Sequence, residues 1–264
     1  MANNFIRVAA WAVALAAAAG TAEAATCSST PGNFESWKPQ MAAEAKAQGI
    51  GARGIAALMA TSYSPGTIRV DRNQHFFHLS LSDFMAKRGA AGVVAIGKRK
   101  KAADAALFAS IQRRFSIPPG AIIAIWGMET GFGGNTGSQP TISAVATLSY
   151  DCRRTDYFTE QLMAALKLVD RGVLSSSTRG AMHGEVGQTQ FLPENILLYG
   201  TDGEGNGSID LDSKADALAS TARFLQAQGM SAGNAYSAGA FAPWNAATVY
   251  QQALAIIAAK IDGN

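Results

Sequence analysis

One apolar stretch, residues 123–137 (IAIWGMETGFGGNTG), constrains the fold of this 264-residue chain more than any other. Pro118 and Pro119 come shortly before it, and proline suits the first turn of a helix because the N–H it lacks has no partner there. The stretch therefore predicts a helix that ends in a loop with four glycines. On that helix Glu129 follows Trp126 by three residues, so its side chain projects from the apolar face.

A carboxyl group in apolar surroundings has a distinctive chemistry. Loss of hydration disfavours its charged form, which raises the pKa of Glu129. A carboxylic acid that keeps its proton near neutral pH can protonate the leaving oxygen of a glycosidic bond, and glycine-rich backbone lets a bulky sugar approach it. The spacing alone is equally consistent with a Glu129 that ends its helix and points into water.

Residues 1–24 have the pattern of a secretory signal peptide, with Arg7, an apolar run over residues 8–19 and a small-residue cleavage site. The apolar run is shorter than the ~20 residues that a spanning helix needs, which favours cleavage over a retained membrane anchor. Cys27 follows Thr26, whereas a lipidated cysteine follows Gly, Ala or Ser. We therefore expect a soluble periplasmic protein without a membrane segment in the mature chain.

Composition also indicates an exported globular protein. The chain is 48% hydrophobic and 16% charged, which argues against disorder. Its net charge of +3 suits an acidic polymer such as a cell wall but, without basic clusters, does not indicate nucleic acid.

The two cysteines, Cys27 and Cys152, favour one disulfide over two free thiols, because export places both in an oxidising compartment. Such a bridge would tie the N-terminal tail to the body of the protein. No histidine motif accompanies either cysteine, so a nucleophilic role is the weaker interpretation.

Helical periodicity dominates the chain after residue 33, and alternating strand patterns are scarce. The fold should therefore be mainly α. Helices are expected at residues 34–49, 54–62, one or two within 80–115, then 119–130, 142–149, 155–171, 213–228 and 246–260.

Several ordered motifs together resemble one protein family. Residues 117–133 (IPPGAIIAIWGMETGFG) resemble the Glu-Thr-x-x-Gly signature of the B-type lytic murein transglycosylases, glycoside hydrolase family 103. Further stretches similar to that family are FESWKPQMAAEAKAQGI (34–50), DRNQHFFHLSLSDFMAKR (71–88), ATLSYDCRRTDYF (146–158), GQTQFLPENILLYG (187–200) and APWNAATVYQQAL (242–254). The resemblance implies a lysozyme-like, goose-type catalytic core over residues 106–264 and an N-terminal helical portion over residues 25–105.

The resemblance also implies the residues of the site. Glu129 falls on the position of the catalytic acid. Groove-lining positions fall on Arg153, Arg154, Gln188, Gln190, Phe191, Trp244, Asn245, Asp71, Arg72 and Gln74. Arginines and amides can bind acetamido and carboxyl groups, while Phe191 and Trp244 either offer flat faces to sugar rings or pack in the core.

The chemistry that the resemblance implies uses one carboxylate and no cofactor. Glu129 would protonate the oxygen between MurNAc and GlcNAc in peptidoglycan glycan strands, and the acetamido oxygen of MurNAc would stabilise the developing positive charge. The ionised Glu129 would then take the proton of the MurNAc 6-hydroxyl as 1,6-anhydroMurNAc forms.

The chain departs from the family pattern at two positions. Residues 184–188 read GEVGQ where the family usually has Gly-Ala-Met-Gly-Gln, which introduces Glu185. Trp244 stands where tyrosine is more usual, so a phenol that could hold Glu129 or the substrate is expected to be missing.

Two alternative functions follow from these observations. A hydrolytic muramidase needs a second carboxylate, ~5–5.5 Å or ~6.5–9.5 Å from the first, and Glu185 is the candidate. A charge on the groove rim is the simpler interpretation of that residue. A non-catalytic wall-binding protein is the other alternative, against which the intact Glu129 argues.

Residues 202–213 (DGEGNGSIDLDS) resemble the twelve-residue loop that binds calcium. The ligand positions hold Asp202, Glu204, Asn206, Ser208 and Asp210, with Gly207 at the turn. Position 12 holds Ser213, which cannot supply a bidentate carboxylate, so a weak structural calcium site and a plain glycine-rich turn both remain open. Ser213 and Asp216 predict a cap for the next helix. The three histidines lack zinc-site spacing.

Overall fold

The computed structural model describes residues 25–73 and 79–264, so the predicted signal peptide and Gln74 lie outside the described residues. The helices are α1 Phe34–Ala47, α2 Ala52–Met59, α3 Pro65–Arg72, α4 Leu81–Lys87, α5 Ala90–Ala103, α6 Ala105–Phe115, α7 Pro119–Thr130, α8 Thr141–Tyr150, α9 Thr155–Asp170, α10 Pro193–Tyr199, α11 Lys214–Ala227 and α12 Thr248–Asp262. Short 3-10 helices cover Pro31–Asn33 and Ala238–Phe241, and β1 (Gln139–Pro140) pairs antiparallel with β2 (Arg179–Gly180).

The mainly α fold predicted from the periodicity is confirmed. The stretch at 80–115 forms three helices rather than one or two, because Gly89, with φ 64°, breaks the first and Asp104 separates the second from the third. The helices α3 and α10 were not predicted. They have 8 and 7 residues, which is too short for a clear periodic signal.

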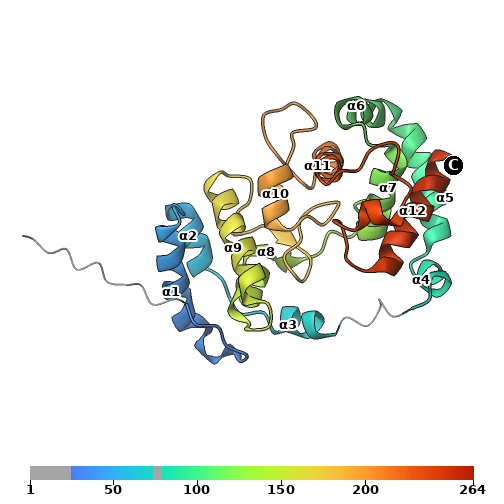
Figure 1. The fold of residues 1–264 in the computed structure, drawn as a ribbon. Helices are drawn as coiled ribbons and strands as arrows, with labels where there is room; N and C mark the ends of the chain where they lie inside the picture. Colours follow the sequence, from blue (N-terminus) through green and yellow to red (C-terminus); the bar gives the residue numbers. More distant parts are fainter. Residues whose placement is uncertain (1–24, 74–78) are drawn as a thin grey trace, which may run out of the picture.

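The helices form two groups around one continuous hydrophobic core (Figure 1). In the first group α1 and α2 pack with α8 and α9, and α10 packs on α9. In the second group α5 and α12 pack on α7, α4 packs on α5 and α12, and α6 and α11 lie alongside. Residues 25–105 contribute helices to both groups, so the N-terminal portion is divided between them.

Helix α7 is the most deeply buried element of the second group. Of its 12 residues Glu129 alone is not buried. Pro118 and Pro119 begin the helix as predicted, and Gly131, with φ 61°, ends it in the left-handed conformation that glycine adopts without strain. In residues 25–73 and 79–264 no helix, α7 included, has the length and apolar character needed to cross a bilayer.

The predicted Cys27–Cys152 disulfide is confirmed, with 5.1 Å between the two Cα atoms. Backbone contacts reinforce it, because Ser28 N–H donates to the carbonyl of Tyr150 at 2.9 Å. The Tyr150 hydroxyl also donates to the carbonyl of Thr30 at 2.9 Å. The N-terminal tail is thereby attached to the junction between α8 and α9.

Replacing both cysteines by serine is expected to lower the free energy of unfolding by about 2–5 kcal/mol. The bridge closes a loop with a sequence separation of 125, so its loss gives the unfolded chain much more freedom. Urea denaturation of the protein and the variant measures the difference. A reductant should lower the midpoint of the original protein alone, and equal midpoints for the two proteins would contradict the expectation.

Candidate active site

Glu129, in the last turn of α7, lies in the wall of a pocket of about 310 Å³. A pocket of this volume can hold one small ligand group. The residues around it come from α7, α9, α10, α11 and the loops beside them. They are Glu129, Tyr157, Glu185, Gln190, Phe191, Leu192, Asn195, Phe224, Pro243, Trp244 and Asn245.

Two donors from outside α7 converge on one oxygen of Glu129. Trp244 Nε1 donates to Oε1 at 2.8 Å, and the Tyr250 hydroxyl donates to the same atom at 2.7 Å. An indole N–H can only donate, so Oε1 must be an acceptor in this contact. A proton on Oε2, which neither donor engages, leaves both of these hydrogen bonds intact when Glu129 is neutral.

Burial raises the pKa of Glu129 above its ordinary value, as expected from its place on the apolar face. The hydrogen bonds from Trp244 and Tyr250 and the charge of Arg88 act in the opposite direction, while the charge of Glu185 adds to the increase. Burial and the charge of Glu129 raise the pKa of Tyr250 well above its ordinary value, so the phenol stays a donor.

The expectation that a phenol is missing near Glu129 is wrong. Tyr250, in the first turn of α12, supplies that phenol, and Trp244 supplies a second donor. The Tyr250 ring packs edge-on against Phe84, with 5.9 Å between the ring centroids. From the segment 242–254 the sequence singled out only Trp244 and Asn245. Whether the Tyr250 side chain points toward Glu129 depends on how α12 packs against α7, which the sequence does not show.

The loop that carries Glu185 is held by a close approach of backbone. Gly180 pairs with Gln139 across the two short strands. A Cβ atom at Gly180 would lie 1.9 Å from the carbonyl oxygen of Glu185, so a side chain cannot fit there. Ala181 N–H donates to that same oxygen at 2.8 Å. Glycine at this position therefore brings the Glu185 segment against the sheet.

Gln188 fixes this loop to α7. Its Oε1 accepts from Trp126 Nε1 at 2.9 Å, and its carbonyl accepts from the Thr130 hydroxyl at 2.6 Å. Its Nε2 donates to the carbonyl of Asp212 at 2.6 Å. The Gln188 amide is thus used inside the protein. Gln190 lines the pocket, and its Nε2 also donates to the carbonyl of Gly187 at 2.9 Å.

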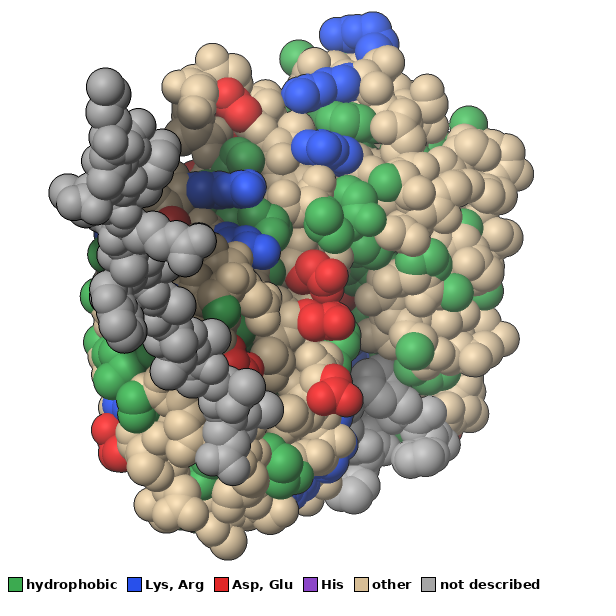
Figure 2. Space-filling view, turned by 60° about the vertical axis from the view of Figure 1, so that its left-hand side comes forward, with side chains coloured by type: hydrophobic (Ala, Val, Ile, Leu, Met, Phe, Trp, Pro, Cys, Tyr) green, Lys and Arg blue, Asp and Glu red, His purple; other side chains and the backbone are tan. Residues whose placement is uncertain are grey.

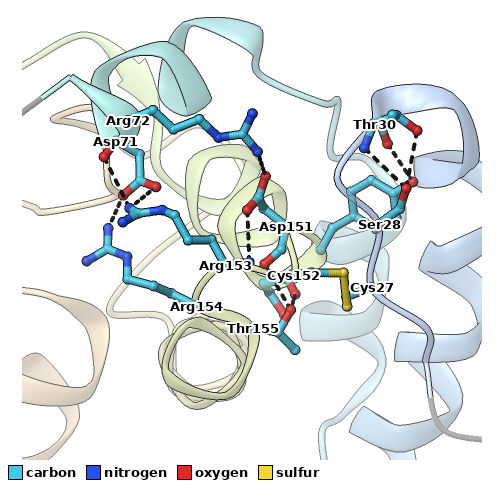
Figure 3. Close-up of polar contacts among 12 residues, drawn as sticks. Cys27, Ser28, Thr30, Asp71, Arg72, Asp151, Cys152, Arg153, Arg154 and Thr155 are labelled. Atoms are coloured by element: carbon cyan, nitrogen blue, oxygen red, sulfur yellow. Dashed lines mark hydrogen bonds and ion pairs between the residues drawn. A yellow bond between two sulfur atoms is a disulfide. The ribbon is translucent and has the colours of Figure 1, made fainter.

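Two motifs that are far apart in the sequence pair with each other (Figure 3). Arg153 and Arg154 both donate to the carboxylate of Asp71, whose side chain is 2% exposed. Arg72 pairs with Asp151 beside them. We call these five residues the Asp71 cluster. The two arginines that pair with Asp71 keep 44% and 36% of their side chains exposed.

Glu185 connects the pocket to the Asp71 cluster through His183. Glu185 Oε1 lies 3.3 Å from His183 Nδ1, and Glu185 Oε2 accepts from the His183 backbone N–H at 3.0 Å. His183 Nε2 in turn lies 3.6 Å from the Asp71 carboxylate. Glu185 is 23% exposed and lines the same pocket as Glu129, so it is more enclosed than a rim charge would be.

Apart from Gln188, the predicted groove residues that the structure describes lie in two places. The pocket brings together Glu129, Glu185, Gln190, Phe191, Trp244 and Asn245, and the Asp71 cluster holds Asp71, Arg72, Arg153 and Arg154. Phe191 is 1% exposed, and its ring packs against Trp244 and Phe224 in the core. Pocket residues that the sequence did not single out are Tyr157, Leu192, Asn195, Phe224 and Pro243.

The loop at residues 202–213 folds around Asp202. The carboxylate of Asp202 accepts the backbone N–H groups of Gly207, Gly205 and Asn206, and these bonds lower its pKa. Gly207 has φ 85°, as the turn of a calcium loop requires. Within the described part of the chain, however, no three His, Cys, Asp or Glu side chains gather as a metal site. The loop therefore fits calcium only in part.

The predicted cap formed by Ser213 and Asp216 is wrong. Ser213 begins α11 without a side-chain cap bond, and its hydroxyl donates to Glu204 instead. The fully buried Asp216 accepts backbone N–H groups from Gly203 at 2.7 Å and Asp210 at 2.8 Å. Asp216 closes the loop because unpaired backbone donors beside a buried helix would be costly.

Charged side chains are unevenly distributed on the surface. On the face shown in Figure 2, Lys and Arg side chains form a row and Asp and Glu side chains form a separate group close by. Neighbouring groups of opposite sign agree with the small net charge of +3. Such a face does not attract a polyanion uniformly.

Sequence comparison identifies a family and a named protein that the chain resembles. The transglycosylase SLT domain family matches residues 33–255. Membrane-bound lytic murein transglycosylase B from Escherichia coli K12 is 33% identical over 117 residues, which cover 44% of this chain and 32% of that protein. The matched part is thus less than half of either protein.

Solved structures give the same relationship. SltB3 from Pseudomonas aeruginosa in complex with NAG-anhNAM-pentapeptide has 34% identity and a TM-score of 0.70, covering 76% of this chain and 54% of that one. Its complex with NAG-NAM-pentapeptide has 26% identity and a TM-score of 0.79, covering 88% and 80%. The E. coli transglycosylase Slt35 with calcium, at 18% identity and TM-score 0.76 over 85% and 92%, shares the fold. The predicted lysozyme-like fold is confirmed.

Glu129→Gln is expected to raise the melting temperature at pH 8 and to change it little at pH 4. Because the folded-state pKa of Glu129 is raised, the stability contributed by its bound proton is fully present below the unfolded-state pKa. That contribution is lost as the pH rises through the folded-state pKa. The glutamine of the variant does not ionise, so the variant does not lose this stability. Each kcal/mol gained corresponds to roughly 2–4 °C.

Differential scanning calorimetry at both pH values measures this effect. Glu160→Gln, which removes an exposed carboxylate on α9, is the matched control and should show no pH-dependent difference. A Glu129→Gln difference that is equal at pH 4 and pH 8 would contradict the raised pKa.

Proposed function

The chain belongs to the transglycosylase SLT domain family, and on that premise we propose that it is a lytic transglycosylase of peptidoglycan. The enzyme cleaves the β-1,4 bond between MurNAc and GlcNAc without water and leaves a 1,6-anhydroMurNAc end. The observation that carries the proposal is the environment of Glu129: a carboxyl group whose pKa is raised by burial, in the wall of a pocket, with one oxygen held by two donors.

The relatives support the substrate class. SltB3 was solved with NAG-NAM-pentapeptide and with NAG-anhNAM-pentapeptide, whose names describe the sugar pair before and after formation of an anhydro ring. Because the first SltB3 match covers 54% of that chain, we transfer only the sugar chemistry around Glu129.

In the first step Glu129 acts as a general acid. Its proton, on Oε2, passes to the glycosidic oxygen as the bond to C1 of MurNAc breaks. Trp244 and Tyr250 stabilise the carboxylate that forms, since both already donate to Oε1. The acetamido oxygen of MurNAc stabilises the positive charge at C1.

In the second step the ionised Glu129 acts as a general base. It takes the proton of the MurNAc 6-hydroxyl while that oxygen bonds to C1, which closes the anhydro ring and restores the neutral acid. One carboxyl group therefore acts in both steps, and the reaction consumes no water.

We assign binding roles according to where the structure places each residue. Gln190 and Asn245 line the pocket; Gln190 offers its amide oxygen and Asn245 its amide N–H to acetamido or hydroxyl groups, since the other half of each amide bonds within the protein. Trp244 acts mainly on Glu129, and Phe191 supports the Trp244 ring. Arg153 and Arg154 hold the chain around Asp71 and present their exposed edges to carboxylates of the peptide stem.

A hydrolytic muramidase is the second candidate, because Glu185 lies in the same pocket as Glu129. The transglycosylase is the better supported of the two. Both oxygens of Glu185 already face nitrogen atoms of His183, which leaves that carboxylate poorly placed to activate a water.

We further propose that the protein acts in the periplasm after cleavage of residues 1–24. The disulfide supports export, because such bridges persist in oxidising compartments. The proposed substrate lies in the same compartment.

Peptidoglycan digested with the purified mature protein is expected to release muropeptides one water lighter than reducing-end muropeptides. Mass spectrometry of the products measures this directly. Reducing ends would replace the proposal by the two-carboxylate muramidase.

In the same assay Glu129→Gln is expected to lower release by about 10²–10⁴-fold, because the amide keeps its acceptor for Trp244 and Tyr250 but carries no acidic proton. Cosedimentation with cell walls should be unchanged. Normal cleavage by this variant would assign the acid elsewhere, and an original protein that binds walls without cleaving them would be a binding module.

We propose that calcium binds weakly at residues 202–213 and has a structural role. It takes no part in the proposed reaction. With a dissociation constant of about 1 mM, 5 mM calcium should stabilise the protein by about 1 kcal/mol, or roughly 2–4 °C. Melting curves with calcium and with a chelator measure this, and Asp202→Asn should abolish the difference. Equal melting temperatures for the original protein would exclude the site.

A further inference from the structure

Glu185 gives the pocket a second carboxylate whose role the one-carboxylate mechanism does not define. It lines the same pocket of about 310 Å³ as Glu129 and is 23% exposed. Both side chains are partly buried, so two negative charges on them are screened less by water than two charges on the open surface would be. The protonation of one carboxyl group must therefore depend on the other.

Both carboxyl oxygens of Glu185 are held by His183. Its Oε1 lies 3.3 Å from His183 Nδ1, and its Oε2 accepts from the His183 backbone N–H at 3.0 Å. Glu185 therefore has a nitrogen atom near each of its oxygens. Behind His183 stands Asp71, which two arginines neutralise.

The charges that face Glu129 come from several elements. Arg88 lies at the end of α4, Glu185 on the loop after β2, and the Tyr250 phenol on α12. The titratable groups around Glu185 are His183, with Asp71 behind it, and Tyr157 on α9. Among these groups Glu185 alone places a like charge on Glu129.

We propose that Glu185 is a positioning residue whose negative charge keeps Glu129 in its acid form until the glycosidic bond breaks. The proposal rests on the function proposed above, because it requires Glu129 to be the proton donor. It gives Glu185 no covalent role and no water to activate.

The same repulsion assists both steps of the reaction. In the resting pocket it favours a proton on Glu129. During cleavage, positive charge at C1 of the sugar lies in the pocket and offsets the repulsion between the two carboxylates. When the anhydro ring closes and that positive charge disappears, the repulsion returns and drives the proton from the 6-hydroxyl onto Glu129.

The test is Glu185→Gln, read as a pH profile of kcat/KM for anhydro-product release. Without the like charge, Glu129 should lose its proton at lower pH. The variant is therefore expected to be about three- to tenfold less active than the original at pH 8 and within about twofold of it at pH 5. Glu185→Asp, which keeps the charge, should restore the original profile. Glu160→Gln, which removes an exposed charge outside the pocket, should leave it unchanged.

A second readout does not depend on activity. In protein labelled with ¹³C-glutamate, the Glu129 carboxyl signal is the one that Glu129→Gln lacks, and its titration should move to lower pH in Glu185→Gln. A titration that does not move overturns the proposal, as does a loss of activity that is equal at every pH. If the original protein instead forms reducing ends, the proposed function fails, and the titration still reports whether Glu185 acts on Glu129.

Discussion

Helix α7 is buried along its length, and the one side chain it leaves partly exposed is the carboxyl of Glu129. A carboxyl group in this position cannot be hydrated as it would be in water, so the protein must supply donors. Trp244 and Tyr250 supply them from the segment before α12 and from its first turn. The packing of α12 against α7 therefore sets which oxygen of Glu129 accepts these two hydrogen bonds, and the bonds partly offset the increase in pKa that burial causes.

The opposite side of the pocket depends on charge pairing. The Asp71 cluster joins the end of α3 to the turn between α8 and α9, beside the disulfide (Figure 3). His183 extends it to Glu185. Glu129 thus belongs to one group of helices, while Glu185 lies on a loop that His183 links to the Asp71 cluster of the other.

Helix positions followed from the sequence because apolar residues recur with helical spacing over most elements. The exceptions have local causes. The helices α3 and α10 are too short to show a period, and the Ser213 cap failed because Asp216 is drawn to the backbone donors of the preceding loop. Asp71, Arg153 and Arg154 were all expected in the groove, but the sequence could not show that the two arginines pair with Asp71, because they lie 82 and 83 residues after it in the chain.

By itself the sequence determined the mainly α fold, the disulfide and the acid candidate, because periodicity, a single pair of cysteines and one carboxylate on an apolar face are properties of short segments. Only the tertiary structure decided what surrounds Glu129. Tyr250, Glu185 and Trp244 lie 50 residues or more after α7 in the sequence. Their hydrogen bonds and shared pocket bring them to Glu129 in the fold. The electrostatics of a buried carboxyl group depend on distances between such segments, and those distances exist only once the helices have packed.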